Sequence, residues 1–269
     1  MKKKTVLFTI LIIALSTHAA MADLIEKTYL VGNTTRHVLL HEGRPSADGR
    51  PLVLVFHGYG GTHRSAARAF QIETVWPDAM VAYIQGLVIP SDRKDGRIDP
   101  GQERPGWQRK TAQDGGRDLQ MVDVLLERLT AEYQVDRRRI YATGFSNGGL
   151  FTWVLVGARP DTFAAYAPVG AVDNGNLVDV TKPKPVIYHF GEKDKAFKLA
   201  WANKSIRRIK ALNRSREPGV TWGPGYTLFE PEDGGAPFVL NLHPRGHEVP
   251  EYAPKAIVRF FKSQLLVRP

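Results

Sequence analysis

One short stretch, residues 139–149, constrains the fold of this chain more than any other. It reads RIYATGFSNGG, so a β-branched and aromatic run breaks at Gly144, presents Ser146 and restarts at Asn147. This is a G-x-S-x-G pattern between a predicted strand and a predicted helix, where the serine at the tip of the turn has strained backbone geometry. Glycines are needed because side chains at Gly144 and Gly148 would collide with the adjoining strand and helix. The pattern predicts an exposed, nucleophilic Ser146, with an ordinary helix N-cap serine as the alternative.

The first 22 residues have the pattern of an export signal. Residues 2–4 are lysines, residues 6–15 form an apolar core, and Ala-Met-Ala at residues 20–22 fits a cleavage site. The apolar core is too short to be a confident membrane span, although an uncleaved anchor is the alternative. We therefore expect a signal peptide over residues 1–22 and a protein exported to the periplasm or the extracellular space, without membrane attachment after cleavage.

Composition limits what the remaining residues can be. The sequence contains no cysteine, so an exported chain has neither a disulfide nor a thiolate metal site. Residues 23–269 suffice for a single α/β catalytic domain that is stable through its core. The formal net charge is +10, but the basic residues are interspersed with acids and no nucleic-acid motif accompanies them. We expect no nucleic-acid partner, no metal and no cofactor, since neither an H-E-x-x-H pattern nor a phosphate-binding glycine loop occurs.

Apolar periodicity predicts short strands that alternate with amphipathic helices. Besides the strand and helix of residues 139–149, the expected strands cover residues 27–31, 37–41, 51–56, 80–84, 163–169, 185–190, 226–229 and 238–242. The expected helices cover residues 64–74, 117–134, 199–212 and 253–265. This alternation indicates a doubly wound, mostly parallel sheet, with the first two strands as an antiparallel N-terminal hairpin. The layout is that of the α/β-hydrolase fold, with a long polar loop inserted at about residues 86–116.

The order of a catalytic triad in this fold, serine then acid then histidine, narrows the choice of base. Only His189, His243 and His247 follow Ser146 in the chain. His189 lies within an apolar run and is predicted to be a sheet residue, and His243 precedes a proline and is given a structural role. His247 is the predicted base, because the adjacent Gly246 would let its ring reach the serine.

The acid is expected on the loop after the strand of residues 185–190. This loop offers Glu192 and Asp194, and Asp194 is favoured because it lies farther from the end of the strand. Asp173, after the preceding strand, is a weaker alternative. Asp194 could instead be a helix N-cap before Ala196, a role that would compete with catalysis.

An oxyanion hole is expected in the glycine-rich segment HGYGG of residues 57–61, which follows the first buried strand. Glycines let backbone N–H groups approach a tetrahedral intermediate without a side-chain clash. We expect donors from the main chain of Tyr59 and Asn147, while spacing alone leaves Gly60 open as an alternative to Tyr59. His57 is predicted to organise the loop by hydrogen bonds.

These residues together predict acyl transfer. His247 would deprotonate Ser146, Asp194 would fix the imidazole tautomer, and the oxyanion hole would stabilise the developing negative charge. Water would then hydrolyse the acyl-enzyme.

Several local strings go beyond the generic fold. In chain order they are HGYGG at 57–61, YIQGL at 83–87, RPGWQ at 104–108, GFSNGG at 144–149 and HPRGH at 243–247. They resemble the secreted polyhydroxybutyrate depolymerase-like and feruloyl esterase-like branch of the α/β-hydrolases, related to carbohydrate esterase family one. The resemblance covers nearly all of the chain after residue 22. It implies a triad of Ser146, Asp194 and His247, the same three residues that the chain order favours.

The substrate is expected to be a carboxylic ester of the feruloyl, acetyl or short hydroxyalkanoate type, either small or attached to a polysaccharide or polyester. Trp107, in the 86–116 loop, is predicted to be exposed and to bind substrate by stacking, with a buried hydrophobic plug as the alternative. Trp201 and Trp222 are predicted to be packing residues. The alternative functions are an acyltransferase or peptidase with the same triad and a non-catalytic carbohydrate-binding module.

Overall fold

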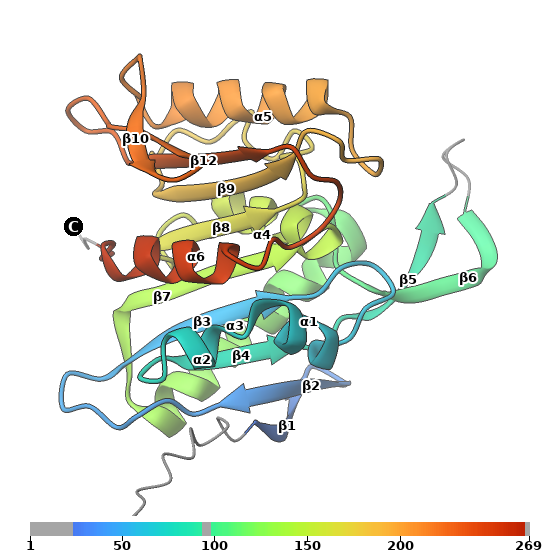
Figure 1. The fold of residues 1–269 in the computed structure, drawn as a ribbon. Coiled ribbons are helices and arrows are strands. Elements are labelled where there is room, and N and C mark those ends of the chain that lie inside the picture. The colour runs from blue at the N-terminus through green and yellow to red at the C-terminus, as the bar shows by residue number, and fades with distance from the viewer. Residues whose placement is uncertain (1–23, 93–97, 267–269) are drawn as a thin grey trace, which may run out of the picture.

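The computed structural model of this protein describes residues 24–92 and 98–266 (Figure 1). The expected signal peptide, residues 1–22, lies outside the described residues and stays a prediction. Within the described ranges, no helix is both long enough and apolar enough to cross a membrane.

A ten-stranded sheet forms the centre of the fold, in the order β1-β2-β4-β3-β7-β8-β9-β12-β11-β10. Its strands are β1 (Ile25–Val31), β2 (Thr34–His41), β3 (Arg50–Phe56), β4 (Met80–Ile84), β7 (Val135–Phe145), β8 (Ala165–Val169), β9 (Val186–Gly191), β10 (Val220–Gly223), β11 (Tyr226–Phe229) and β12 (Phe238–His243). The six strands from β4 to β12 pair in parallel. The β1-β2 hairpin is antiparallel, as predicted, and β10 and β11 add a second antiparallel edge that the sequence did not predict.

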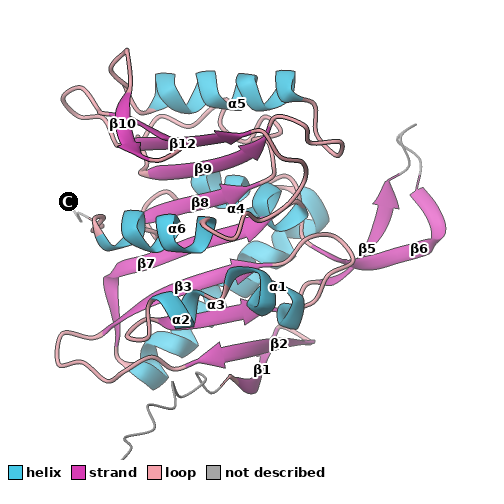
Figure 2. Cartoon of the chain, viewed as in Figure 1, coloured by secondary structure: helices cyan, strands magenta, loops and turns pink. Residues whose placement is uncertain are grey.

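Helices cover both faces of this sheet (Figure 2). One face carries α1 (His63–Phe70), α2 (Ile72–Val75) and α6 (Ala253–Lys262), and the other carries α3 (Arg117–Tyr133), α4 (Asn147–Ala158) and α5 (Leu199–Leu212). The buried apolar residues form two separate clusters, one beneath each helical layer. Because the parallel strands are buried on both faces, they read in the sequence as continuous apolar runs. The observed layers are those of the predicted α/β-hydrolase fold.

The segment 86–116, expected to be a long loop, is instead mostly a β-hairpin. Strands β5 (Leu87–Asp92) and β6 (Ile98–Gly106) pair with each other in a second, two-stranded sheet that projects from the body of the molecule (Figure 1). A short 3-10 turn, Gln113–Gly116, then leads into α3. At the base of the hairpin a Cβ on Gly86 would lie 2.6 Å from the Gly106 carbonyl oxygen, so the two strands approach too closely for a side chain there. Prolines and charges in the hairpin obscured its strand pattern.

His189 lies within β9, as predicted, and gives the fold a dependence on pH. Its side chain is fully buried, its Nε2 lies 3.0 Å from the Tyr226 hydroxyl, and burial lowers its pKa to about 3. In the unfolded chain a histidine has a pKa of about 6.5, so between these values the unfolded state binds the proton and the folded state does not. Stability therefore falls as the pH falls below about 6.5.

We expect His189→Leu to weaken this dependence. Between pH 7 and pH 5 the wild type should lose about 2 kcal/mol of unfolding free energy through His189 alone. Urea unfolding at the two pH values measures the loss, and the variant should lose about 2 kcal/mol less than the wild type. Equal losses in both proteins would contradict the buried, neutral state of this ring.

Candidate active site

The carboxyl ends of the parallel strands meet at one edge of the sheet, and the predicted site residues lie on the loops that leave it. Ser146 follows β7, and its backbone has φ 55° and ψ −117°. A positive φ is sparsely populated by residues other than glycine and stores on the order of 1–3 kcal/mol of strain. The Ser146 N–H donates to the Val169 carbonyl at 2.9 Å, and the Leu150 N–H donates to the Ser146 carbonyl at 2.8 Å. Hydrogen bonds from both sides therefore hold the strained turn.

The glycines around Ser146 are required by close backbone approach, as predicted. A Cβ on Gly144 would lie 2.5 Å from the Gly148 carbonyl oxygen, and a Cβ on Gly148 would lie 2.2 Å from the Phe56 carbonyl oxygen at the end of β3. Both obstacles are backbone atoms, so no side-chain rotation can remove them.

Gly148→Ala should therefore lower the unfolding free energy by about 2–3 kcal/mol, the range for overpacking a closed site. Gly223→Ala is the matched control, because its nearest neighbour is the end of the flexible Arg259 side chain at 3.4 Å. Chemical denaturation of both variants measures the difference. A similar loss in both would mean that α4 can move away from β3 without penalty.

Ser146, His247 and Asp194 form one hydrogen-bonded chain. His247 Nε2 lies 2.8 Å from Ser146 Oγ, and its Nδ1 lies 2.7 Å from Asp194 Oδ2. The His247 ring lies between the rings of Phe145 and Phe197, with centroid distances of 4.7 and 5.8 Å. The Asp194 carboxylate is inaccessible to solvent, whereas the histidine side chain is 24 % exposed. The structure therefore brings the three predicted residues together with the spacing that general-base activation of a serine requires.

Asp194 is the partner of His247 and also caps a local turn, but it is not the helix N-cap that was the alternative, because α5 begins at Leu199 with Lys198 at its N-cap position. Its Oδ1 accepts hydrogen bonds from the N–H groups of Ala196 and Phe197 at 2.7 and 2.9 Å, and its Oδ2 faces His247. A carboxylate has enough lone pairs for both, so capping the turn and orienting the imidazole do not compete. The backbone bonds fix the direction in which the carboxylate points.

The alternative acids and bases do not join this hydrogen-bonded chain. Asp173 is bound by Arg208 and Ser205. Glu192 is exposed, and its N–H donates to the carbonyl of His243, which is buried beside the proline as expected. A Cβ on Gly191 would lie 2.2 Å from the Gly246 carbonyl oxygen, so a glycine is required at the end of β9 for the acid and histidine loops to approach.

The loop after β3 is organised by His57. Its Nε2 accepts the Gly86 N–H at 2.9 Å and its Nδ1 lies 2.7 Å from the Gly58 carbonyl, so Nδ1 carries the proton. Burial lowers the pKa of this ring to about 4, which keeps it neutral in this bonded state. The Gly60 N–H, one of the two candidate donors to an oxyanion, donates instead to the Pro105 carbonyl at 2.8 Å. That bond favours Tyr59 as the donor from this loop.

Trp107 does not stack on substrate, because it is fully buried, so the exposed position predicted for it is wrong. Its ring packs edge-on against Phe56 and stacks on Phe151, and its Nε1 donates to the His57 carbonyl at 2.8 Å. The alternative, a hydrophobic plug, describes it correctly. A loop residue of this size is buried here because β6 ends directly above the sheet edge.

Two side chains that the sequence did not single out hold the base of the hairpin. The Asn147 side chain accepts the Trp107 N–H at 2.7 Å and donates to the Trp107 carbonyl at 3.1 Å. Gln108 Oε1 accepts the N–H groups of Asp118 and Leu119 at the start of α3. Asp118 in turn forms a buried ion pair with Arg36 at 2.7 Å. The only signal for these contacts was the string at residues 104–108, whose bonding partners lie in other elements.

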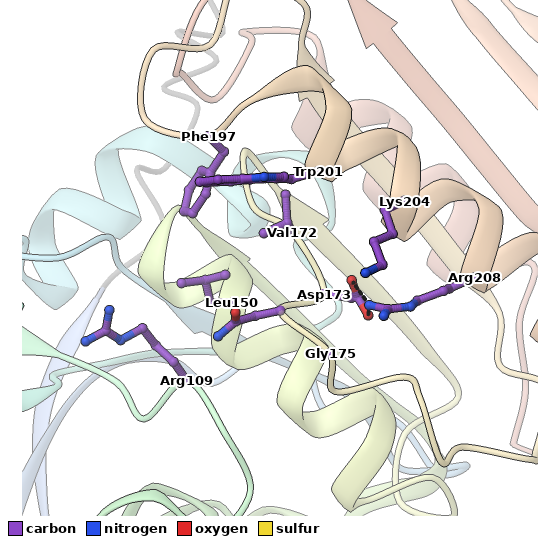
Figure 3. A pocket seen from close by; sticks show the side chains of 10 residues that line it. Arg109, Leu150, Val172, Asp173, Gly175, Phe197, Trp201, Lys204 and Arg208 are labelled. Carbon is purple, nitrogen blue, oxygen red and sulfur yellow. Dashed lines mark hydrogen bonds and ion pairs between the residues drawn. The ribbon is translucent and has the colours of Figure 1, made fainter. Parts of the chain in front are cut away.

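A cavity of about 450 Å³ is lined by residues of α4, of α5 and of the loop after β8 (Figure 3). Its apolar wall consists of Leu150, Val172, Phe197 and Trp201, and its charged wall of Arg109, Asp173, Lys204 and Arg208. The cavity borders the triad because Leu150 is bonded to Ser146 and Phe197 contacts the His247 ring. Trp201 is 49 % exposed, so the packing role predicted for it is wrong. Trp201, rather than Trp107, is the tryptophan that faces this cavity.

Comparison with known proteins places the chain among the α/β-hydrolases. Residues 105–214 match the Prolyl oligopeptidase family (Peptidase_S9). Among solved structures, the acetyl xylan esterase from Aspergillus awamori superposes with a TM-score of 0.67 at 16 % identity, over 88 % of this chain and 98 % of that one. The Bacillus cereus carboxylesterase superposes with a TM-score of 0.60 at 18 % identity, over 84 % and 92 % of the two chains. These likenesses establish the fold.

Curated relatives carry esterase names. The putative esterase NocK of Nocardia uniformis subsp. tsuyamanensis is 31 % identical over 172 residues, 61 % of this chain and 47 % of that protein. The probable feruloyl esterase C of Aspergillus terreus is 26 % identical over 140 residues, 50 % of this chain and 47 % of the relative. The chain spans about half the length of these relatives. The chain therefore has the α/β-hydrolase fold and is similar in sequence to proteins named esterases.

Proposed function

We propose that this protein is a serine carboxylesterase in which Ser146 is the nucleophile, His247 the general base and Asp194 the residue that orients the base. One observation carries the proposal: the hydrogen-bonded chain from Asp194 through His247 to Ser146, at distances of 2.7 and 2.8 Å, ends on a serine held in a strained turn. A helix N-cap serine requires neither the strain nor the histidine.

The geometry supports a two-step reaction. His247 Nε2 accepts the proton of Ser146 as Oγ attacks the ester carbonyl, and then returns it to the departing alcohol. Asp194, bonded to Nδ1, holds the imidazole with Nε2 directed at the serine and stabilises the imidazolium ion. A water molecule, deprotonated by the same histidine, releases the acid from Ser146.

The negative charge that develops on the ester carbonyl oxygen must be stabilised by hydrogen-bond donors near Ser146. The N–H of Asn147 is the first amide of α4, where the partial positive charge of a helix N-terminus gathers. The Tyr59 N–H, on the loop that His57 and Gly86 brace, is the second donor of this proposal. Preorganised donors of this kind stabilise a tetrahedral intermediate because they need no rearrangement during the reaction.

The names of the relatives support aryl-acyl and acetyl esters as substrates, since they include feruloyl and acetyl xylan esterases. Short hydroxyalkanoate esters, small or polymeric, are also proposed as substrates, on the basis of the sequence resemblance alone. The open cavity with Trp201 on its wall accommodates a flat or apolar group beside the reacting ester. A peptidase is the second candidate, because residues 105–214 match the Prolyl oligopeptidase family.

Hydrolysis of a substrate panel tests the proposal. Methyl ferulate, 4-nitrophenyl acetate and methyl 3-hydroxybutanoate represent the three ester classes, and an alanine 4-nitroanilide represents an amide. We expect at least one ester to be hydrolysed much faster than the amide, and a fluorophosphonate probe to label Ser146 as mapped by mass spectrometry. Faster amide cleavage would favour the peptidase, and an unlabelled Ser146 with no turnover would contradict both.

Export is part of the same proposal and rests on the sequence of residues 1–22. Mass spectrometry of the protein recovered from its native compartment should find an N-terminus at Asp23. Recovery with Met1 intact would contradict cleavage.

A further inference from the structure

The cavity beside the triad carries more positive charge than binding a neutral ester requires. On α5, Lys204 and Arg208 contribute two cations to its wall, against the single carboxylate of Asp173. Asp173 is only 2 % exposed, and both of its oxygens accept hydrogen bonds from Arg208 Nη1 at 3.0 and 2.8 Å. The Asp173 carboxylate therefore holds Arg208 in place, and the charged wall of the cavity keeps a net positive charge.

Arg208 is held so that part of its guanidinium group is available to a ligand. Ser205 fixes the position of Asp173, the partner of Arg208. The Ser205 hydroxyl donates to Asp173 at 3.0 Å and accepts the Asp173 N–H at 2.9 Å. Arg208 uses Nη1 alone in this pair, and no acceptor for its Nε or Nη2 occurs among the residues that the structure describes. Its side chain is 26 % exposed. The remaining N–H groups form a planar edge that matches the two oxygens of a carboxylate.

Lys204 adds a second charge at the same place. It lies one turn before Arg208 on α5, and Figure 3 shows both side chains directed toward Asp173. Asp173 supplies one negative charge for these two cations, so the repulsion between them is only partly offset and an anionic ligand would stabilise the pair. Arg109 lies on the opposite wall of the same cavity.

Aromatic residues of the cavity wall lie between the triad and this charge along the chain. Phe197 contacts His247, and Trp201, Lys204 and Arg208 follow at spacings of three and four residues along one side of α5. From Trp201 to Arg208 the helix rises about 10 Å. A substrate bound here would lay its reacting ester at Ser146, an apolar or flat segment along Phe197 and Trp201, and an anionic group at Lys204 and Arg208.

We propose that the preferred substrate is an ester that also carries a carboxylate, recognised by Lys204 and Arg208, with an apolar segment between the ester and the carboxylate. This inference rests on the proposed esterase function. The reaction remains hydrolysis: water adds to the ester and an acid and an alcohol are released, while the recognised carboxylate is unchanged.

Matched pairs of esters that differ only in charge test the proposal. On the acyl side, monomethyl suberate is compared with methyl suberamate, in which an amide replaces the carboxylate. On the alcohol side, 6-acetoxyhexanoate is compared with its amide. We expect kcat/KM to be at least tenfold higher for the acid in one of the two pairs, and the pair that responds identifies which side of the ester enters the cavity.

Variants of α5 separate local recognition from net charge. Lys204→Glu should reduce the acid-to-amide ratio of kcat/KM at least tenfold. Arg207→Glu makes the same change in net charge on the same helix but outside the cavity wall, and should leave the ratio within twofold. An equal effect of both variants would assign the preference to long-range attraction and overturn the proposed site.

Binding to Ser146→Ala, measured by calorimetry with the same esters, distinguishes failure of this inference from failure of the esterase proposal. Turnover of esters with an acid-to-amide ratio near one overturns the carboxylate site and leaves the esterase intact. If no ester is turned over, but Ser146→Ala binds monomethyl suberate at least tenfold more tightly than its amide and Lys204→Glu removes this difference, the anion site stands and the esterase fails. No turnover and no selective binding overturns both.

Discussion

Ser146→Ala should lower kcat for ester hydrolysis by about six orders of magnitude, the loss typical of a triad that loses its nucleophile. The substitution removes only Oγ, so His247 keeps its bond to Asp194 but has no hydroxyl to deprotonate. The Cβ remains, and the backbone strain at this position is therefore the same in both proteins. We expect the residual rate to come from the oxyanion donors alone. Steady-state kinetics on the best ester of the panel measures the loss.

The matched control for this variant is Ser263→Ala, just after α6, where the removed hydroxyl donates to the Phe260 carbonyl and accepts a hydrogen bond from Gln264 Nε2. It should retain wild-type kcat, and thermal unfolding should show that Ser146→Ala is folded. A folded Ser146→Ala that kept more than a hundredth of wild-type activity would exclude Ser146 as the nucleophile.

The elements that position the triad could be predicted from the sequence because their signals are local. The sequence signal for the end of the strand, the tight turn at Ser146 and the start of the helix lies within residues 139–149, and the buried parallel strands read as apolar runs. Chain order then left few choices for the partners of Ser146. The hydrogen bonds to His247 and Asp194 agree with the base and the acid predicted from the sequence. The two roles of Asp194 could not be predicted, because one carboxylate oxygen binds the turn and the other faces His247.

The two tryptophans were assigned the wrong way round because burial of a side chain outside the regular core depends on remote elements. Trp107 is covered by Phe56 of β3 and Phe151 of α4. Both residues are far from Trp107 in the sequence, so the residues next to Trp107 do not indicate that it is buried. Trp201 lies on α5 outside the row of buried apolar residues Ala202, Ile206 and Ile209, and it faces the cavity instead. The hairpin β5-β6 was missed for a related reason, because it pairs only with itself and lacks the apolar run of a buried strand.

Asp194→Asn separates the two roles of this residue and should have the second largest effect. The amide oxygen of asparagine can still accept the N–H groups of Ala196 and Phe197, so the turn before α5 keeps its cap. The amide nitrogen then faces His247 Nδ1 and donates to it, which places the imidazole proton on Nε2. In that tautomer the ring cannot accept the proton of Ser146. We expect kcat to fall about 10⁴-fold at neutral pH, with thermal stability close to that of the wild type.

Asp194→Ala is the contrasting variant, because it removes both the cap and the partner of the histidine. It should lose activity to a similar degree and also about 1 kcal/mol of unfolding free energy, because the N–H groups of Ala196 and Phe197 lose their acceptor. Kinetics with equilibrium unfolding of the two variants therefore gives a distinct pattern: both are slow, and only the alanine variant is less stable. If Asp194→Asn kept most of its activity while Asp194→Ala lost stability, the carboxylate would be a cap alone, and Ser146 and His247 would act without an acid.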